Sequence, residues 1–471
     1  MLPVFSRTTR QARFSLQLFV LCFASLSFCQ STATQVADLQ RQARAAAALG
    51  NMDKALASCD EALKLNPRST QSSLLKSSLL LQAGRFPEAI TAYQAVRRAH
   101  PADETAVVGL STAYRKVFNY EEADKVLSGY LARRPRAVSV RIALAELDLQ
   151  QQHYEQAVRE LKRVLTQDAN NAQAHLDLGV AYQSLNQGGL ALAEFNAAIR
   201  HNPQLISAYY FRGRYLSDQN DNAHAAEDAQ KVLQKEPENR PAAVLLAKIE
   251  LRLSKCEEAQ EILKPVVQAE KENTEALFLL SRAYECTHQE DFAKITRSEF
   301  DRVSHEQESM HSAQTDADHL AEQAAEAARH NQLQPAMDFL QQALAKDPQN
   351  ASAHALLAKI YFSEGDAGKA QKAIEVALQA KPYHPDYLYV LGKIREKQGD
   401  RGGALSAFQQ VIAVNPAESD AYFEIAEIYH QTGQRSEAIA ALRKAVQLSP
   451  GDADYKHALA LLEAEAPPTK R

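Results

Sequence analysis

The chain has 471 residues, of which 45% are hydrophobic and 24% are charged, as in ordinary folded proteins. Its formal net charge is -5, from 53 basic and 58 acidic side chains. This balance argues against nucleic-acid binding, which needs a strongly basic face. The length would normally indicate about three globular domains, but the chain carries an internal periodicity that indicates a different organisation.

The N-terminal segment, residues 1–29, is typical of a secretory signal peptide. Arg7, Arg10 and Arg13 form a basic beginning, and an apolar stretch follows from residue 14 to residue 29. This stretch is shorter than the ~20 residues that a membrane-spanning helix needs. We therefore expect an exported protein, periplasmic or associated with the bacterial outer membrane.

The end of this segment leaves alternatives open. We expect cleavage just before Gln30, and cleavage after Ala33 is the alternative. A retained membrane anchor is a second alternative. A lipid anchor on Cys29 is disfavoured, because such anchors follow a small residue and Phe28 is large.

Beyond this segment, alanine recurs every 34 residues, with one longer step of 43 residues between Ala293 and Ala336. The ladder consists of Ala55, Ala89, Ala123, Ala157, Ala191, Ala225, Ala259, Ala293, Ala336, Ala370, Ala404 and Ala438. A second ladder of small residues lies twelve positions earlier in each repeat: Ala43, Ser77, Ser111, Ala145, Gly179, Gly213, Ala247, Ser281, Ala324, Ala358, Gly392 and Ala426. A fixed period of this length predicts a repeat array in which each repeat stacks on its neighbours.

Residues 172–205 show how one repeat forms a helix pair. Apolar residues recur at helical spacing before and after the segment 186–189, whose asparagine and glycines favour a tight turn. Pro203 then ends the second helix, since proline has no N–H to donate. We expect Gly179 and Ala191 to lie where the two helices cross most closely, because a large side chain there would separate the backbones.

This pattern resembles the tetratricopeptide repeat (TPR) family. The signature places in residues 172–205 are held by Leu178, Gly179, Tyr182, Ala191, Phe195, Ala198 and Pro203. The resemblance covers residues 36–452 and implies an all-α, right-handed α-solenoid of about twelve helix-turn-helix repeats with a C-terminal capping helix. The repeat at residues 274–307 departs most from the pattern, because Arg297 stands at a usually apolar place.

The array has one interruption, the polar segment 304–316. It separates eight repeats in residues 36–303, the last of them degenerate, from four repeats in residues 317–452. The segment is either a helical extension or a flexible hinge, and we favour the hinge because Arg297 leaves its helix poorly buried. Residues 453–466 form the predicted capping helix, with Ala458, Leu459, Leu461 and Leu462 to bury, and residues 467–471 form a tail.

Three cysteines follow the predicted signal peptide. Cys59 occupies a core place in its repeat. Cys256 and Cys286 fall near the bends of adjacent repeats, at the same edge of the stack. Export would permit a disulfide between them, while two partly buried free thiols are the alternative that we favour.

No catalytic or cofactor motif accompanies the repeats. The sequence holds no phosphate-binding loop, paired-histidine zinc helix or nucleophile elbow. The histidines His305, His311, His319 and His330 straddle the interruption without ligand-like spacing, so we predict no metal site. Because repeats leave no room for a catalytic domain, we expect a protein that is not an enzyme and needs no cofactor.

The resemblance implies that the first helix of each pair lines a concave groove, chiefly through the second, fifth, ninth and twelfth places of the repeat. Two stretches there combine aromatic and cationic residues. The first holds Tyr210, Arg214, Lys248, Phe278 and Arg282, and the second holds Lys359, Phe362, Tyr389, Lys393 and Phe423. Aromatic and arginine side chains are frequent at binding hot spots, although half-exposed helix residues that pack on the next repeat are the structural alternative.

Two particular functions of TPR proteins are disfavoured. Gln40 and Arg44 stand at the places where chaperone-binding members carry a lysine and an asparagine. The asparagine ladder of sugar-transferring members is also missing from this sequence.

We therefore expect an exported, non-catalytic scaffold that holds a protein or peptide partner in its groove. Its process would be envelope assembly, secretion or polysaccharide export. One alternative is a self-associating structural spacer. Another is an accessory subunit of a separately encoded glycosyltransferase or polysaccharide synthase.

Overall fold

The structure is a computed structural model that describes residues 32–464. The predicted signal peptide (1–29) and tail (467–471) lie outside these residues. Helices joined by short turns make up the described residues, which contain no strand. None of their helices is both long enough and apolar enough to cross a membrane. The predicted all-α solenoid class is confirmed.

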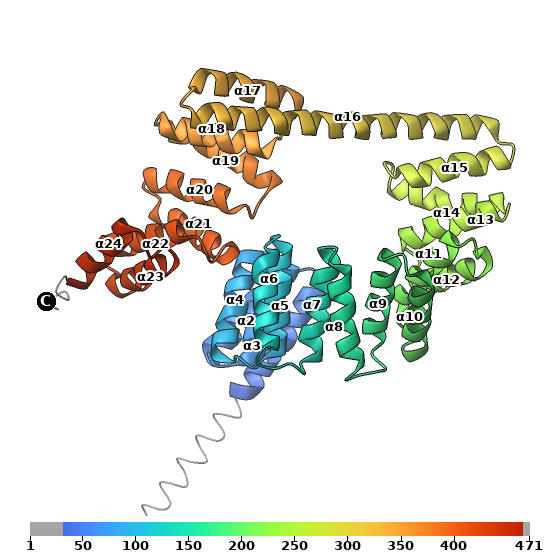
Figure 1. The fold of residues 1–471 in the computed structure, drawn as a ribbon, viewed down its shortest axis with the longest axis horizontal. Helices are drawn as coiled ribbons and strands as arrows, with labels where there is room; N and C mark the ends of the chain where they lie inside the picture. Colours follow the sequence, from blue (N-terminus) through green and yellow to red (C-terminus); the bar gives the residue numbers. More distant parts are fainter. Residues whose placement is uncertain (1–31, 465–471) are drawn as a thin grey trace, which may run out of the picture. The chain divides into compact units, whose positions relative to one another are not determined.

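The described chain divides into a central part, residues 127–408, and a terminal part, residues 32–126 with 409–464. The terminal part contains a helix over residues 32–48 and helices α2 (Met52–Leu65), α3 (Thr70–Gln82), α4 (Phe86–Ala99), α5 (Glu104–Lys116), α22 (Ser419–Gln431), α23 (Arg435–Leu448) and α24 (Ala453–Ala464). Helices α6 (Tyr120–Leu131) and α21 (Arg401–Val414) cross the boundaries (Figure 1).

The central part holds the helices from α7 to α20 (Figure 1). They are α7 (Val138–Gln150), α8 (Tyr154–Leu165), α9 (Ala172–Ser184), α10 (Gly188–His201), α11 (Ile206–Asp218), α12 (Asn222–Lys235), α13 (Arg240–Arg252), α14 (Cys256–Ala269), α15 (Thr274–Cys286), α16 (Glu290–Arg329), α17 (Leu333–Lys346), α18 (Ala351–Ser363), α19 (Ala367–Ala380) and α20 (Pro385–Lys397).

Helices α9 and α10 form the helix pair predicted for residues 172–205. The Asn171 side chain caps α9 by accepting a hydrogen bond from the backbone N–H of Ala174 at 3.0 Å. Asn186 makes the turn with a φ of 58°, in the left-handed region. Helix α10 ends at His201, two residues before Pro203. The sequence therefore predicted both helices and the turn between them.

A residue in the left-handed region recurs at the turn inside each helix pair. These residues are Gly50, Gly84, Phe118, Gln152, Asn186, Asn220, Ser254, His288, Asn331, Gly365, Gly399 and Gly433. Glycine and asparagine adopt this conformation at the lowest steric cost. Phe118 occupies it with a φ of 60° although its ring is exposed, so the position in the repeat determines the conformation even where the residue type does not favour it.

Both ladders of small residues lie inside the array. Every alanine of the first ladder is at most 6% exposed. A Cβ atom added to Gly213 would lie 3.3 Å from the carbonyl oxygen of Ala225, on the other helix of the same pair. At Gly179 the nearest neighbour is instead the Phe195 ring of α10. The ladders therefore allow both close backbone approach and the insertion of a ring between the helices.

Replacing Gly179 with alanine is expected to destabilise the array by about 1–3 kcal/mol, through overpacking. The added Cβ would lie 2.5 Å from Cε1 of Phe195, whose ring is fully buried. The matched control is Gly189→Ala, because no atom lies within 4 Å of the Cβ that it adds. The control should be neutral or slightly stabilising. Thermal unfolding followed by circular dichroism compares the two, and equal melting temperatures would contradict the packing argument.

The polar segment 304–316 is helical. It lies inside α16, a single helix of 40 residues (Figure 1). The favoured prediction of a flexible hinge is therefore wrong for its local structure, and the alternative of a helical extension describes it. Residues 305–312 are exposed, and Arg302 pairs with Glu299 and Glu306 one turn away on either side. Such pairs stabilise a helix that is polar on all sides.

The buried core is interrupted along α16. Within the described chain, Val303 is the one buried apolar residue between Ala293 and Ala317. The cause lies at the place of Arg297. The other repeats bury a residue there: Cys59, Tyr93, Leu127, Leu161, Phe195, Ala229, Leu263, Leu340, Ile374, Phe408 and Leu442. The Arg297 side chain is instead 46% exposed, so this repeat presents a polar face where another repeat would stack.

The predicted capping helix is present as α24. Leu462 and Tyr455 are buried, while Ala458 and Leu459 pack against the same cluster. The prediction that Leu461 is buried is wrong, since this side chain is 55% exposed. Helix α24 buries the side chain of Tyr455 and not that of Leu461.

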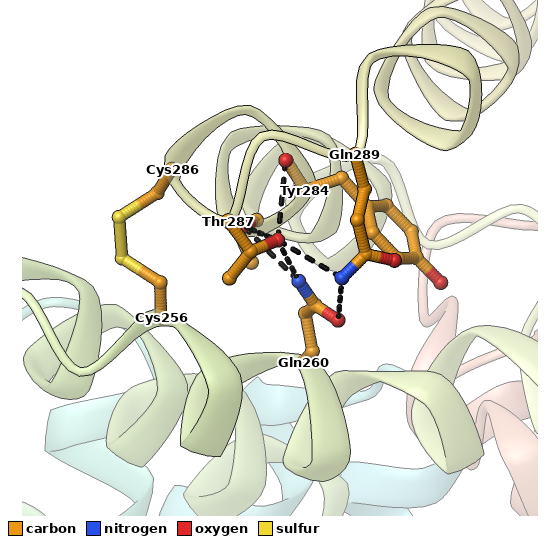
Figure 2. Close-up of a disulfide and its surroundings, with 7 residues drawn as sticks. Cys256, Gln260, Tyr284, Cys286, Thr287 and Gln289 are labelled. Atoms are coloured by element: carbon orange, nitrogen blue, oxygen red, sulfur yellow. Dashed lines mark hydrogen bonds between the residues drawn. A yellow bond between two sulfur atoms is a disulfide. The ribbon is translucent and has the colours of Figure 1, made fainter.

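Cys256 and Cys286 form a disulfide, with their Cα atoms 6.0 Å apart (Figure 2). The free thiols that we favoured from the sequence are therefore the wrong alternative for this pair. The bond joins the first residue of α14 to the last residue of α15. It links two adjacent repeats at their bends, directly before α16. Cys59 is free and buried, as expected for a core place.

A buried polar network lies beside the disulfide (Figure 2). The Gln260 amide donates to the Ala283 carbonyl at 3.2 Å and also to the Thr287 hydroxyl. Gln289 donates to Gln260 Oε1 at 3.2 Å and to Thr287 Oγ1 at 3.1 Å. Gln260 is only 4% exposed, so these bonds satisfy an amide that would be costly to bury alone. Together with the disulfide they fix the turn from which α16 starts.

Candidate partner-binding site

The first predicted stretch lies on three successive first helices of the central part. Tyr210 and Arg214 lie on α11, Lys248 lies on α13, and Phe278 and Arg282 lie on α15. Helix α13 packs against both α11 and α15. We call Arg214, Lys248 and Arg282 the cation row, since each occupies the ninth place of its repeat.

The cation row has few carboxylate neighbours. In the part of the chain that the structure describes, the shortest distance from this row to a carboxylate oxygen is the 3.9 Å between Lys248 Nζ and Glu275 Oε1. Among the described residues, Arg214 and Arg282 have no carboxylate oxygen within 4.0 Å. Instead, the Arg214 guanidinium lies 5.0 Å from the centre of the Phe211 ring. The Arg282 guanidinium lies 6.0 Å from the centre of the Phe278 ring. The two arginines of the row thus lie over aromatic faces and remain available to anions.

The second predicted stretch is less coherent. Lys359 is exposed on α18, but Lys393 Nζ pairs with Glu396 Oε2 at 2.8 Å. The rings of Phe362 and Tyr389 are both partly buried, and Tyr389 packs against Phe408 with ring centres 5.4 Å apart. Part of this stretch therefore has a packing role.

Phe423, the last residue predicted for the second stretch, belongs to the terminal part of the chain. Its ring stacks on Tyr455 of the capping helix, with ring centres 5.2 Å apart. The structure therefore gives Phe423 a role in attaching α24.

Sequence reasoning missed two residues beside the first stretch. Arg297 was interpreted only as a packing defect, and Phe300 was not noted. The Arg297 guanidinium lies 5.5 Å from the centre of the Phe278 ring and 5.2 Å from that of Phe300. The sequence did contain an indication of this contact: Arg297 is a cation at a place that is apolar in the other repeats.

A buried carboxyl group lies on α9. Asp177 is 8% exposed, and the Gln173 amide donates to its Oδ1 at 2.8 Å. Its Oδ2 is buried without a hydrogen-bond partner. Burial, with a smaller contribution from Glu146, raises the pKa of Asp177 to about 7. No local feature of the sequence indicated an acidic residue at this place, because the equivalent residues of the two neighbouring repeats, Ala143 and Phe211, are apolar.

Asp177→Asn is expected to stabilise the array at pH 8 by on the order of 1–3 kcal/mol. The folded pKa of Asp177 lies above its unfolded value, so folding takes up a proton as the pH falls from about 8 to 5. The stability of the wild type should rise over this interval relative to the variant. Urea unfolding at several pH values measures the difference. The exposed control Asp218→Asn should leave the pH dependence of the free energy of unfolding unchanged. If the difference in unfolding free energy between Asp177→Asn and the wild type is the same at every pH, the assignment is contradicted.

The four histidines considered from the sequence do not cluster. His305, His311 and His319 are exposed at separate points along α16, and His330 follows its end. The His330 ring hydrogen-bonds to Glu326 at 2.9 Å, one helical turn away.

Comparison with known families finds repeats along the chain. Tetratricopeptide repeat models match residues 41–104 and 389–453 and residues 320–394. A TPR repeat model matches residues 145–186.

The similar curated proteins are much longer than this chain. The probable UDP-N-acetylglucosamine–peptide N-acetylglucosaminyltransferase SPINDLY of Eustoma exaltatum subsp. russellianum is 36% identical over 85 residues, which are 18% of this chain and 9% of the relative. The Superkiller complex protein 3 of Homo sapiens is 24% identical over 233 residues, 46% of this chain and 15% of the relative. This chain thus corresponds to a small fraction of either protein.

Two solved structures resemble the fold. A tetratricopeptide repeat protein from Parabacteroides merdae ATCC 43184 has a TM-score of 0.41 at 18% identity, over 53% of this chain and 99% of that one. The APC/C hetero-tetramer Cut9–Hcn1 has a TM-score of 0.30 at 12% identity, over 90% of this chain and 95% of that one.

Proposed function

Because the chain belongs to the tetratricopeptide repeat family, we propose that it is a non-catalytic, exported scaffold that binds a protein partner on its first helices. The cation row carries this proposal. Arg214, Lys248 and Arg282 recur at one place of three successive repeats, and each is at least partly exposed. Aromatic rings beside the two arginines add contact area, and aromatic and arginine side chains are enriched among the residues that dominate the energetics of protein interfaces.

Neutralising the cation row tests this role. The variant Arg214→Gln, Lys248→Gln, Arg282→Gln is compared with Lys231→Gln, Lys235→Gln, Lys271→Gln, which removes three exposed charges elsewhere. The mature chain is used to capture its partner from envelope extracts, and the affinity is then measured with the purified partner. We expect the first variant to bind at least about tenfold more weakly, and the control to bind like the wild type. Equal binding by both variants would reject the cation row as the partner site.

Export is the second element of the proposal. The sequence of residues 1–29 supports it, and the Cys256–Cys286 disulfide suits an oxidising compartment. Mass spectrometry of the protein from fractionated cells tests it. We expect a mature chain that begins at Gln30, with its disulfide formed, in the periplasmic or outer-membrane fraction. An intact N-terminus in the cytosolic fraction would refute export.

A further inference from the structure

The repeat at residues 274–307 carries an arginine–aromatic cluster, which we define as Phe278, Arg282, Arg297 and Phe300. The two rings lie with their centres 5.5 Å apart. Arg297 of α16 lies within 5.5 Å of both ring centres, and Arg282 of α15 lies 6.0 Å from the centre of Phe278. Two guanidinium groups from different helices are thus gathered around one half-buried ring.

The two guanidinium groups of the cluster are not fully neutralised by nearby carboxylates. The Arg297 side chain is 46% exposed, and its nearest carboxylate is Asp301, with 3.5 Å between Nε and Oδ1. Both partners are exposed, so this pair contributes little to stability. Arg282 is exposed and has no carboxylate within 4.0 Å in the described chain. Of the two guanidinium groups, one is therefore uncompensated and the other is weakly paired.

An arginine at position 297 reduces the packing of this repeat. The place of Arg297 is buried in the other repeats and stabilises stacking there. Here that stabilisation is given up, and the arginine lies across two rings at the end of the cation row. Ring faces restrict a guanidinium and leave its N–H groups free for a planar anion.

We propose that the arginine–aromatic cluster binds a carboxylate-bearing, acidic segment of the protein partner. This inference rests on the proposed scaffold function and names the chemistry of its ligand. The forked N–H groups of Arg282 and Arg297 match the geometry of Asp and Glu carboxylates. The cation row supplies further positive charge on α13 and α11, so an extended segment with several acidic residues is complementary to the whole surface.

A labelled synthetic peptide tests the proposal. The probe is a fluorescein-labelled peptide of alternating Glu and Ser residues, and fluorescence anisotropy measures its affinity for the full mature chain at low salt. Arg282→Gln and Arg297→Gln are each expected to weaken binding about tenfold. Arg329→Gln, which removes an exposed arginine at the other end of α16, should have no effect. A peptide with Lys in place of Glu should not bind.

Two further variants separate binding from a structural role. Arg297→Lys keeps the charge but loses the planar fork, so it should weaken binding less than Arg297→Gln. Asp301→Asn removes the competing carboxylate and should strengthen binding about two- to threefold. A structural effect alone would not produce this gain. Melting temperatures of all variants confirm folding, which is expected since the substituted side chains are exposed.

Three outcomes would overturn the inference. One is equal affinity of the acidic peptide for the wild type, Arg282→Gln and Arg297→Gln. Another is tighter binding of an oligogalacturonate than of the peptide, which would assign the cluster to an acidic polysaccharide. The third is unchanged partner capture by Arg297→Gln while the triple cation-row variant loses capture. In that case the scaffold function stands and only the cluster assignment fails.

Discussion

Replacing Phe195 with alanine is expected to lower the free energy of unfolding by about 3–5 kcal/mol. The ring is fully buried between α9 and α10, over Gly179, and lies near Phe211 and Tyr215 with ring centres 6.5 Å apart in both pairs. The glycine leaves no side chain that could fill the vacated space. The loss therefore combines the transfer free energy of the ring with that of a cavity.

The matched control for this variant is Phe292→Ala, on the second helix of another repeat. Phe292 is 57% exposed and stacks only on Tyr284 in the described structure, with ring centres 5.4 Å apart. Its removal should cost less than about 1 kcal/mol. Urea unfolding followed by circular dichroism measures both variants. Because repeats interact mainly with their neighbours, the backbone amides of the Phe195→Ala variant should lose protection against hydrogen exchange mainly in α9 and α10. A small, evenly spread loss would contradict the packing assignment.

The second large effect is expected from proline in the exposed middle of α16. Ser312→Pro removes a backbone donor, and its ring clashes with the carbonyl of Glu308, at a cost of about 3 kcal/mol or more. Residues 305–312 are exposed and bury no apolar side chain that could restore the helix. Gln307 makes one tertiary contact, by donating to the Glu272 carbonyl at 3.1 Å. The population of locally open chain should therefore rise about a hundredfold.

Cleavage by a glutamate-specific protease measures this opening. Glu306 and Glu308 lie in the exposed segment, whereas the segment 303–328 contains no lysine or arginine for trypsin. We expect rapid cleavage of Ser312→Pro at these two residues and slow cleavage of both the wild type and Ser312→Ala. Equally rapid cleavage of the wild type would mean that the segment is open in solution, as the hinge interpretation held.

The periodic features of the fold could be predicted from the sequence because their causes are local. Asn186 and the glycines after it stop one helix and start the next, and Gly179 and Ala191 mark the places that must be small. The repeat then places the same features along the chain. None of these inferences required knowledge of a distant contact.

The helical state of residues 304–316 escaped prediction because hydrophobic periodicity reports burial, and this segment is exposed. The informative signal was a different one. No glycine or proline occurs between residues 290 and 329, and Arg302 has glutamates three residues before it and four residues after it. These features favour a helix in water without any core to pack against.

The candidate site was only partly predictable, since its contacts join residues of different helices. The sequence identified Phe278 and Arg282 by their places in the repeat. It also detected that Arg297 was unusual, but one of the two rings that Arg297 contacts, that of Phe278, is 19 positions earlier in the chain and on another helix. The disulfide was only the less favoured alternative for a related reason: the sequence placed Cys256 and Cys286 at one edge but gave no distance between them.

The disulfide also has a mechanical consequence. A scaffold held at one end and attached to a partner at the other experiences tension along its backbone. The disulfide joins residues 30 positions apart, so the loop between Cys256 and Cys286 cannot extend when the chain is stretched. Fully extended, this loop would add about 100 Å to the length of the chain. In single-molecule stretching, reduction should release that length as an added increment in the unfolding trace. The bond thus protects helices α14 and α15, the second of which bears Arg282, against being drawn out by force.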